Sequence, residues 1–298
     1  MAISSWVVGG LNERLAAILL WSLAHAPLGL ARFYVSLLDL AIPRLRRTAM
    51  RNLEFAYPEK SQAERRAITD DVFLSIARLI WIFARFPQYN SQNIHKLIRY
   101  EGLEHYLEAK KAGRGILFAT AHFGNWELSA FSHALMTEPM HIMIRPLDNR
   151  GIDRLVEDRR RLSGNHLIVK WDGARAVLRA LHQNEAVGVL IDQNTSIQEG
   201  VFVDFFGTPA CANTAFAKIA AKTGAAVIPG FAIWSEEERK YILKFHPPLE
   251  ISGDATEDTR RLHAVLEGVI RDHPGQWLWI HRRWKTRPAG EPSLYDKI

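Results

Sequence analysis

The chain has 298 residues, of which 48% are hydrophobic and 23% charged, so it can bury a large core and is not disordered throughout. Its formal net charge of +6 favours an anionic partner but does not choose among nucleic acid, a membrane surface and an acidic protein. The single cysteine, Cys211, excludes an intrachain disulfide and a cysteine-cluster zinc site.

The first predicted feature is an apolar helical segment over residues 11–42, interrupted near Pro27. Residues 15–31 carry no formal charge, which is close to the lower limit for a membrane-spanning helix. A basic cluster, PRLRRTAMR, follows and is typical of a segment beside an anionic leaflet. We expect residues 1–45 to form an N-terminal helical membrane anchor, peripheral or single-pass, and residues 46–298 to form an α/β domain. The alternative is a buried helical hairpin with a solvated basic turn.

The next elements are helical. Residues 61–86 predict a long helix, with Ser61 as N-cap, Glu64 at the third helical position and Pro87 beyond its end. Residues 103–112 predict a shorter helix.

From residue 116 onward, expected strands and helices alternate. The strands are expected at residues 116–121, 141–145, 167–171, 187–192, 201–206, 226–233 and 241–245. The helices are expected at residues 125–136, 151–162, 174–182, 213–222 and 256–271. Strands such as ILFATA are apolar throughout, which indicates burial on both faces. The pattern predicts an α/β fold with a mixed, largely parallel central sheet flanked by helices. Ligands bind beyond the carboxyl ends of such strands, where His122 and Asp192 stand.

His122 is the leading candidate for a reactive group. The sequence contains no G-x-S-x-G elbow, no H-E-x-x-H helix, no Walker loop and no G-x-G-x-x-G turn. A turn at Gly124 and a helix capped by Asn125 would place Glu127 in the first helical turn. Its carboxylate could then fold back onto the imidazole, fix the tautomer and leave the other ring nitrogen free as a base. The alternative is a first-turn acid favoured by the helix dipole and a structural histidine near the core.

The run HFGNWEL … IRPLDNRGIDRLVEDRR … GVLIDQNTSIQEGVFVDFFGTPACANTAFAKIAAKTGAAVIPGF resembles the bacterial lipid A biosynthesis acyltransferases of the lauroyl/myristoyl type. HFGNWE is similar to the H-x4-D/E motif of the wider lysophospholipid acyltransferase superfamily. The resemblance implies an inner-membrane enzyme, at the cytoplasmic face, that moves a fatty acyl chain from acyl carrier protein to a hydroxyl of a glycolipid, the lipid A precursor. It implies no cofactor and no metal.

The resemblance also assigns residues. His122 would be the general base and Glu127 its charge-relay carboxylate. The predicted substrate-binding residues are Asn125, Arg145, Arg159, Asp192 and Gln193, with Arg145 suited to a phosphate or the oxyanion. In LIDQN, Asn194 stands where an acid is usual.

The terminal block WLWIHRRWKTRP interleaves tryptophans with basic residues, a pattern that could bind single-stranded nucleic acid. The resemblance favours phosphorylated lipid headgroups or the acidic carrier protein instead, and no nucleic acid. Two alternatives stay open for the whole chain. One is an acyl-CoA-dependent acyltransferase for another glycolipid, such as a phosphatidylinositol mannoside. The other is a non-catalytic lipid-binding protein.

Overall fold

The computed structural model describes residues 2–169 and 173–296, with side chains from residue 13 onward. The helices are α1 (Ala2–His25), α2 (Leu28–Ala41), α3 (Pro43–Ala56), α4 (Gln62–Ala84), α5 (Leu103–Lys111), α6 (Trp126–Met136), α7 (Arg150–Arg161), α8 (Gly173–His182), α9 (Ala215–Thr223) and α10 (Ala255–Asp272), with short 3-10 turns η1 (Phe86–Gln88), η2 (Ile94–Lys96) and η3 (Pro274–Gln276). The strands are β1 (Ile98–Glu101), β2 (Ile116–Thr120), β3 (His141–Ile144), β4 (His166–Val169), β5 (Ala186–Leu190), β6 (Gly200–Phe205), β7 (Thr208–Asn213), β8 (Ala226–Ser235) and β9 (Lys240–Phe245).

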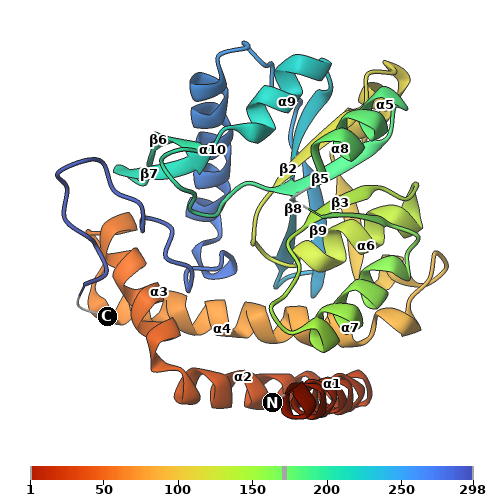
Figure 1. Ribbon diagram of the computed structural model, residues 1–298, viewed down its shortest axis with the longest axis vertical. Helices are drawn as coiled ribbons and strands as arrows, with labels where there is room; N and C mark the ends of the chain where they lie inside the picture. The colour runs from red at the N-terminus through yellow and green to blue at the C-terminus, as the bar shows by residue number, and fades with distance from the viewer. Residues whose placement is uncertain (1, 170–172, 297–298) are drawn as a thin grey trace.

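The central sheet has the order β1-β9-β8-β2-β5-β3-β4, and β6 and β7 form a separate antiparallel hairpin (Figure 1). Within the sheet only the β8–β9 pair is antiparallel. The predicted α/β fold with a mixed, largely parallel sheet is therefore confirmed. The strands β1 and β7 and the helix α3 were not expected. The basic cluster, read as a turn in one of the two alternatives, lies in α3.

Side chains of β2 alternate between two cores, as its apolar sequence predicts. Ile116 and Phe118 pack with residues of α4, α5 and α6 on one face. Leu117 and Ala119 pack with α8, α9 and α10 on the other. The sheet is thus the middle of three layers, and the carboxyl ends of β2, β5 and β3 meet at one edge.

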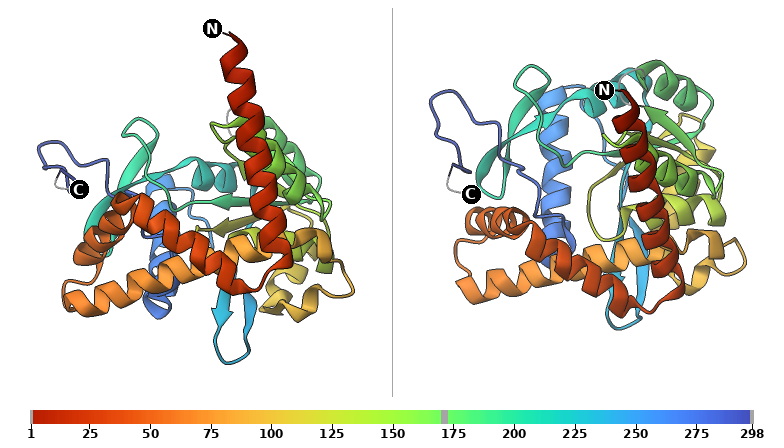
Figure 2. Two further views of the ribbon diagram at one scale, coloured as in Figure 1. Left: turned by 90° about the horizontal axis from the view of Figure 1, so that it is seen from below. Right: turned by 60° about the horizontal axis from the view of Figure 1, so that its bottom comes forward.

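The N-terminal helices α1 and α2 break at Pro27, as expected. The helix α2 lies along α4, whereas α1 is seen end-on in Figure 1 and runs across α4 to contact α7. The far end of α1 projects past the rest of the chain in the left view of Figure 2. The helix α4 begins at the predicted capping box of Ser61 and Glu64. Among the described residues, no helix combines the length and hydropathy needed to cross a membrane, so the expected apolar anchor is not supported in its spanning form.

The tryptophans of the terminal block pack inside the protein and are not available to headgroups or a carrier protein, whereas Lys285 of the same block is exposed. Trp277, Trp279, Trp284 and Arg283 are fully buried. The three indoles join one core cluster with residues of α3, α4, α10 and the β6–β7 hairpin. Asn52 on α3 fastens this segment, because its amide donates to the carbonyls of Trp279 and His281. These tryptophans are therefore core residues. Burial of their large apolar rings is favourable where each indole N–H finds a hydrogen-bond acceptor.

Candidate active site

The stretch His122–Asn125 connects β2 to α6 and is held from both sides. On one side, Leu278 N donates to His122 O and Gly124 N donates to Gln276 O. On the other, Asn125 N donates to Ala232 O of β8. Gly124 has φ +56° and a Cβ there would overlap the Ala232 carbonyl, so this turn requires glycine. The loop therefore presents His122 from a fixed backbone.

Asp192 is the carboxylate that contacts the imidazole. His122 Nδ1 lies 2.9 Å from Asp192 Oδ1, and the backbone N–H of His122 donates to Asp192 Oδ2 at 3.0 Å. The indole of Trp277 donates to the same Oδ2 at 2.9 Å. The register explains the contact, since Thr120 of β2 pairs with Leu190 of β5 and each site residue follows two positions later.

This contact sets the proton on the ring. A carboxylate accepts only, so Nδ1 carries the hydrogen and Nε2 keeps its lone pair. Gln193 Nε2 lies 3.4 Å from that free nitrogen, as a weak donor would. The ring also packs edge-on against Trp126. The arrangement orients a partly buried imidazole through Nδ1 and leaves the lone pair of Nε2 without a strong partner.

The electrostatics raise the pKa of the His122 imidazole above its ordinary value. Burial by itself lowers the pKa of His122, but the adjacent Asp192 carboxylate outweighs it and the net pKa is raised above 6.5, with Glu127 adding to the rise. Asp192 is also buried, which alone would raise its pKa, yet His122 and the indole of Trp277 hold that pKa well below its usual range. Asp192 thus stays ionised at neutral pH.

The Glu127 carboxylate is hydrogen-bonded to Arg160 and not to the imidazole, which contradicts the expected fold-back. Its two oxygens accept from Arg160 Nε and Nη2 at 2.9 and 2.6 Å, a bidentate pair. Both side chains are mostly buried, with exposed fractions of 12% for Glu127 and 20% for Arg160. The reason is geometric. Glu127 points toward Arg160 of α7, and Asp192, which follows β5, occupies the position next to the imidazole Nδ1. Glu127 acts on His122 through space and not through a hydrogen bond.

The other residues that were predicted to bind substrate lie at different distances from His122. Asn125 is fully buried and caps α6 through Leu128 N, as expected. Arg145 is exposed at the end of β3, on the same sheet edge as His122. Arg159 faces α1, on a different side of α7 from Arg160. The structure therefore gathers His122, Asp192 and Gln193 and places Arg159 elsewhere.

Comparison with known proteins decides the family. The family model for bacterial lipid A biosynthesis acyltransferases matches residues 10–286. The chain belongs to this family. It is 31% identical to the lipid A biosynthesis lauroyltransferase of Escherichia coli K12, covering 93% of this chain and 92% of that protein. It is 28% identical to a lipid A biosynthesis acyltransferase of Haemophilus influenzae, covering 84% and 79% respectively. The lipid A biosynthesis myristoyltransferase of E. coli K12 is 27% identical, covering 85% and 79%.

This acyltransferase has residues at the site that sequence reasoning missed. Arg160 was passed over in favour of Arg159, its neighbour in the same RRR run. Trp277 was read as part of a surface block, although it donates directly to Asp192. Neither role has a local signal, because both contacts join segments far apart in the sequence. The tryptophan-rich composition of the block was the one visible hint.

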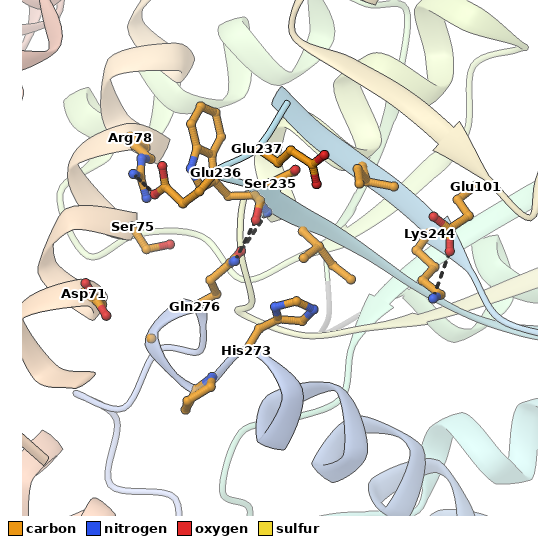
Figure 3. Close-up of a pocket in the computed structure, with 15 residues that line it drawn as sticks. Asp71, Ser75, Arg78, Glu101, Ser235, Glu236, Glu237, Lys244, His273 and Gln276 are labelled. Carbon is orange, nitrogen blue, oxygen red and sulfur yellow. Dashed lines mark hydrogen bonds and ion pairs between the residues drawn. The ribbon is translucent and has the colours of Figure 1, made fainter. Parts of the chain in front are cut away.

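A cavity of about 640 Å³ lies behind the His122–Asn125 loop of the acyltransferase, between α4, the β8–β9 turn and η3 (Figure 3). Gln276 stands in it, and its amide pairs with the backbone of Trp234 in both directions. The same residue's carbonyl accepts from Gly124. His122 does not line this cavity. Gln276 therefore lines the cavity with its side chain and supports the His122–Asn125 loop with its carbonyl. Within the described residues, no group of three or more metal-binding side chains occurs.

Proposed function

We propose that this acyltransferase moves a fatty acyl chain from the thioester of acyl carrier protein to a hydroxyl of a lipid A precursor, with His122 as the general base. The observation that carries the proposal is the imidazole with Nδ1 bound to Asp192 and Nε2 free. Family membership supports acyl transfer to lipid A. The donor and the residue roles are the proposed part.

The proposed reaction is direct transfer. His122 Nε2 takes the proton of the acceptor hydroxyl as its oxygen attacks the thioester carbon. The tetrahedral intermediate then expels the thiolate, which recovers a proton from the imidazolium. The proposed reaction has no acyl-enzyme intermediate. The one thiol of the chain, Cys211, is not suited to carry the acyl group, because it is buried and burial raises its pKa.

Two groups are suited to stabilise the oxyanion. The first N–H groups of α6, at Trp126 and Glu127, lack intrahelical acceptors and follow the catalytic loop directly. Arg160 is the second, because Glu127 engages Nε and Nη2 and leaves Nη1 to bind an anionic oxygen. In this proposal Asp192 orients the base, and Glu127 positions Arg160.

Membrane association belongs to the same proposal. Leu15, Ile18 and Trp21 on α1 and Phe33 and Leu40 on α2 are exposed apolar side chains. The exposed cations Arg14, Arg32, Arg44 and Arg47 lie on the same N-terminal helices or at the start of α3. Apolar and basic side chains together suit a helix that lies in an anionic interface, and we propose peripheral binding to the cytoplasmic face of the inner membrane.

The test offers purified protein acyl carrier proteins of several chain lengths, or the matching acyl-CoA, with the Kdo-bearing precursor, and identifies products by mass spectrometry. We expect transfer from the carrier protein and its loss in His122→Ala with the fold intact by circular dichroism. If transfer occurred from acyl-CoA and not from acyl carrier protein, acyl-CoA would be the donor and the proposed donor would be wrong. A competent covalent acyl-protein, or substantial activity in His122→Ala, would overturn the mechanism.

A further inference from the structure

A second cavity, of about 410 Å³, lies on the N-terminal side of the molecule between α1, the end of α4 with η1, and α7. Its walls are mostly apolar, formed in part by Ala17, Trp21, Ala24, Pro87 and Leu155. Its size falls within the range of small-ligand sites. The catalytic residues do not line it.

The walls of this cavity are fixed in the protein as it stands. Arg85 donates to the carbonyls of Ala24 and Ala26 at the end of α1, and Gln88 donates to Ala24 as well. At the other end, Arg154 of α7 pairs with Glu13 of α1. The helices that form the cavity are thus tied together by polar contacts at both ends.

Arg159 supplies the one permanent charge among the residues lining the cavity. Three other arginines of α7 have carboxylate partners: Arg154 pairs with Glu13, Arg160 with Glu127 and Arg161 with Glu157. Arg159 forms no ion pair with any described residue, and its buried Nε has no hydrogen-bond partner there. A half-buried cation without a counter-ion is costly, and an anionic oxygen would relieve that cost.

The surroundings identify the kind of anion. Beside the cavity, α1 exposes Ile18 and Trp21, with 61% and 65% of their surface accessible. A soluble anion would satisfy Arg159 but leave these side chains in water. A molecule with an anionic head and an apolar chain satisfies both.

We propose that this cavity binds an anionic phospholipid of the surrounding bilayer, with its phosphate on Arg159 and an acyl chain against α1 and Leu155. Such a lipid is neither donor nor acceptor in the acyl transfer. The bound lipid would link α1 to α7. On α7, Arg160 directly follows Arg159 and pairs with Glu127.

The test titrates detergent-solubilised full-length protein with phosphatidylglycerol and, in parallel, with phosphatidylcholine, inorganic phosphate and laurate. Thermal unfolding and native mass spectrometry report binding, so the outcome is independent of acyl transfer. We expect phosphatidylglycerol to bind and to raise the unfolding midpoint, and the other three to do so much less. Arg159→Gln is expected to bind it at least about tenfold more weakly, as for a lost charge-assisted hydrogen bond.

Two further variants sharpen the result. Arg161→Gln removes the same charge from a half-exposed residue of the same helix, so it should bind phosphatidylglycerol as the wild type does. Leu155→Trp fills the cavity without changing charge and should weaken binding as Arg159→Gln does. Equal binding of phosphatidylcholine, a stronger effect of laurate or phosphate, or wild-type binding by Arg159→Gln would each overturn the proposal.

Discussion

His122 and Asp192 are 70 residues apart in the chain, yet the imidazole Nδ1 lies 2.9 Å from the carboxylate. The parallel pairing of β2 with β5 places them side by side at the carboxyl edge of the sheet. Trp277 closes the arrangement from the C-terminal segment by donating to the second carboxylate oxygen. Three distant segments thus build one oriented base.

Replacing the orienting carboxylate should change both rate and pH dependence. In Asp192→Asn we expect kcat to fall by about 10²- to 10⁴-fold, because the tautomer and the imidazolium lose their support. A general base must be neutral, so wild-type kcat/KM rises as the pH passes through the pKa of His122. Burial lowers this pKa, but Asp192 raises it by more, and the net pKa lies above 6.5. Without that carboxylate, burial dominates and the acidic limb should move to lower pH.

A pH–rate profile of the residual activity measures this shift. Glu238→Gln removes a carboxylate that pairs with Arg99 at the surface and should leave the profile unchanged. An acidic limb in Asp192→Asn at or above the wild-type position would refute the assignment of Asp192 as the orienting group.

The Glu127–Arg160 pair should matter for stability as well as activity. Glu127→Gln leaves a mostly buried guanidinium without its partner, which typically costs about 3–5 kcal/mol in the free energy of unfolding. The double variant Glu127→Gln/Arg160→Met removes both charges, and we expect it to regain much of that stability while acyl transfer stays low. Chemical unfolding followed by tryptophan fluorescence measures the stability of the single and the double variant, and the transfer assay measures their activity.

Breaking the exposed Arg161–Glu157 pair with Arg161→Met provides the comparison, and it should cost no more than about 1 kcal/mol. If Glu127→Gln were as stable as this control, the pair would not be the support that its burial indicates.

Gly124 should tolerate no side chain. We expect Gly124→Ala to unfold the loop or to abolish transfer, because its Cβ would overlap the Ala232 carbonyl at a positive φ. Gly113 has φ +72° and open space around it, so Gly113→Ala carries only the backbone strain, about 1–2 kcal/mol. Thermal unfolding and activity of the two variants separate strain from overlap. If Gly124→Ala and Gly113→Ala lowered stability and activity equally, the close approach of Gly124 to the Ala232 carbonyl of β8 would be unimportant.

Asn52 should be a stability centre far from the chemistry. Its amide nitrogen donates to two backbone carbonyls, and its oxygen accepts from the Tyr295 hydroxyl at 2.7 Å. Asn52→Leu leaves these buried groups unpaired, and at about 1–3 kcal/mol for each the loss should reach about 3 kcal/mol or more. Tyr295→Phe removes one hydroxyl and should cost less. Denaturant midpoints at equal m-values check the order, and a smaller loss in Asn52→Leu than in Tyr295→Phe would contradict it.

The sequence by itself determined most of the elements and indicated His122 as the candidate reactive group. The apolar strands predicted a sheet buried on both faces, Ser61 and Glu64 predicted the start of α4, and Gly124 with Asn125 predicted the turn and cap that hold His122. These signals are local, because they depend on side-chain period, backbone conformation and capping within a few residues.

Only the tertiary structure decided which carboxylate serves the imidazole and where the tryptophan block lies. Glu127 and Asp192 carry the same functional group, and proximity in sequence favoured Glu127. Strand register placed Asp192 next to Nδ1, and α7 supplied Arg160 to Glu127. Likewise, composition made the tryptophans of the basic aromatic block look exposed, whereas acceptors such as Asp192 and Pro274 O allow the indole N–H groups to be buried. Partners of this kind depend on the packing of distant segments, which no local pattern in the sequence encodes.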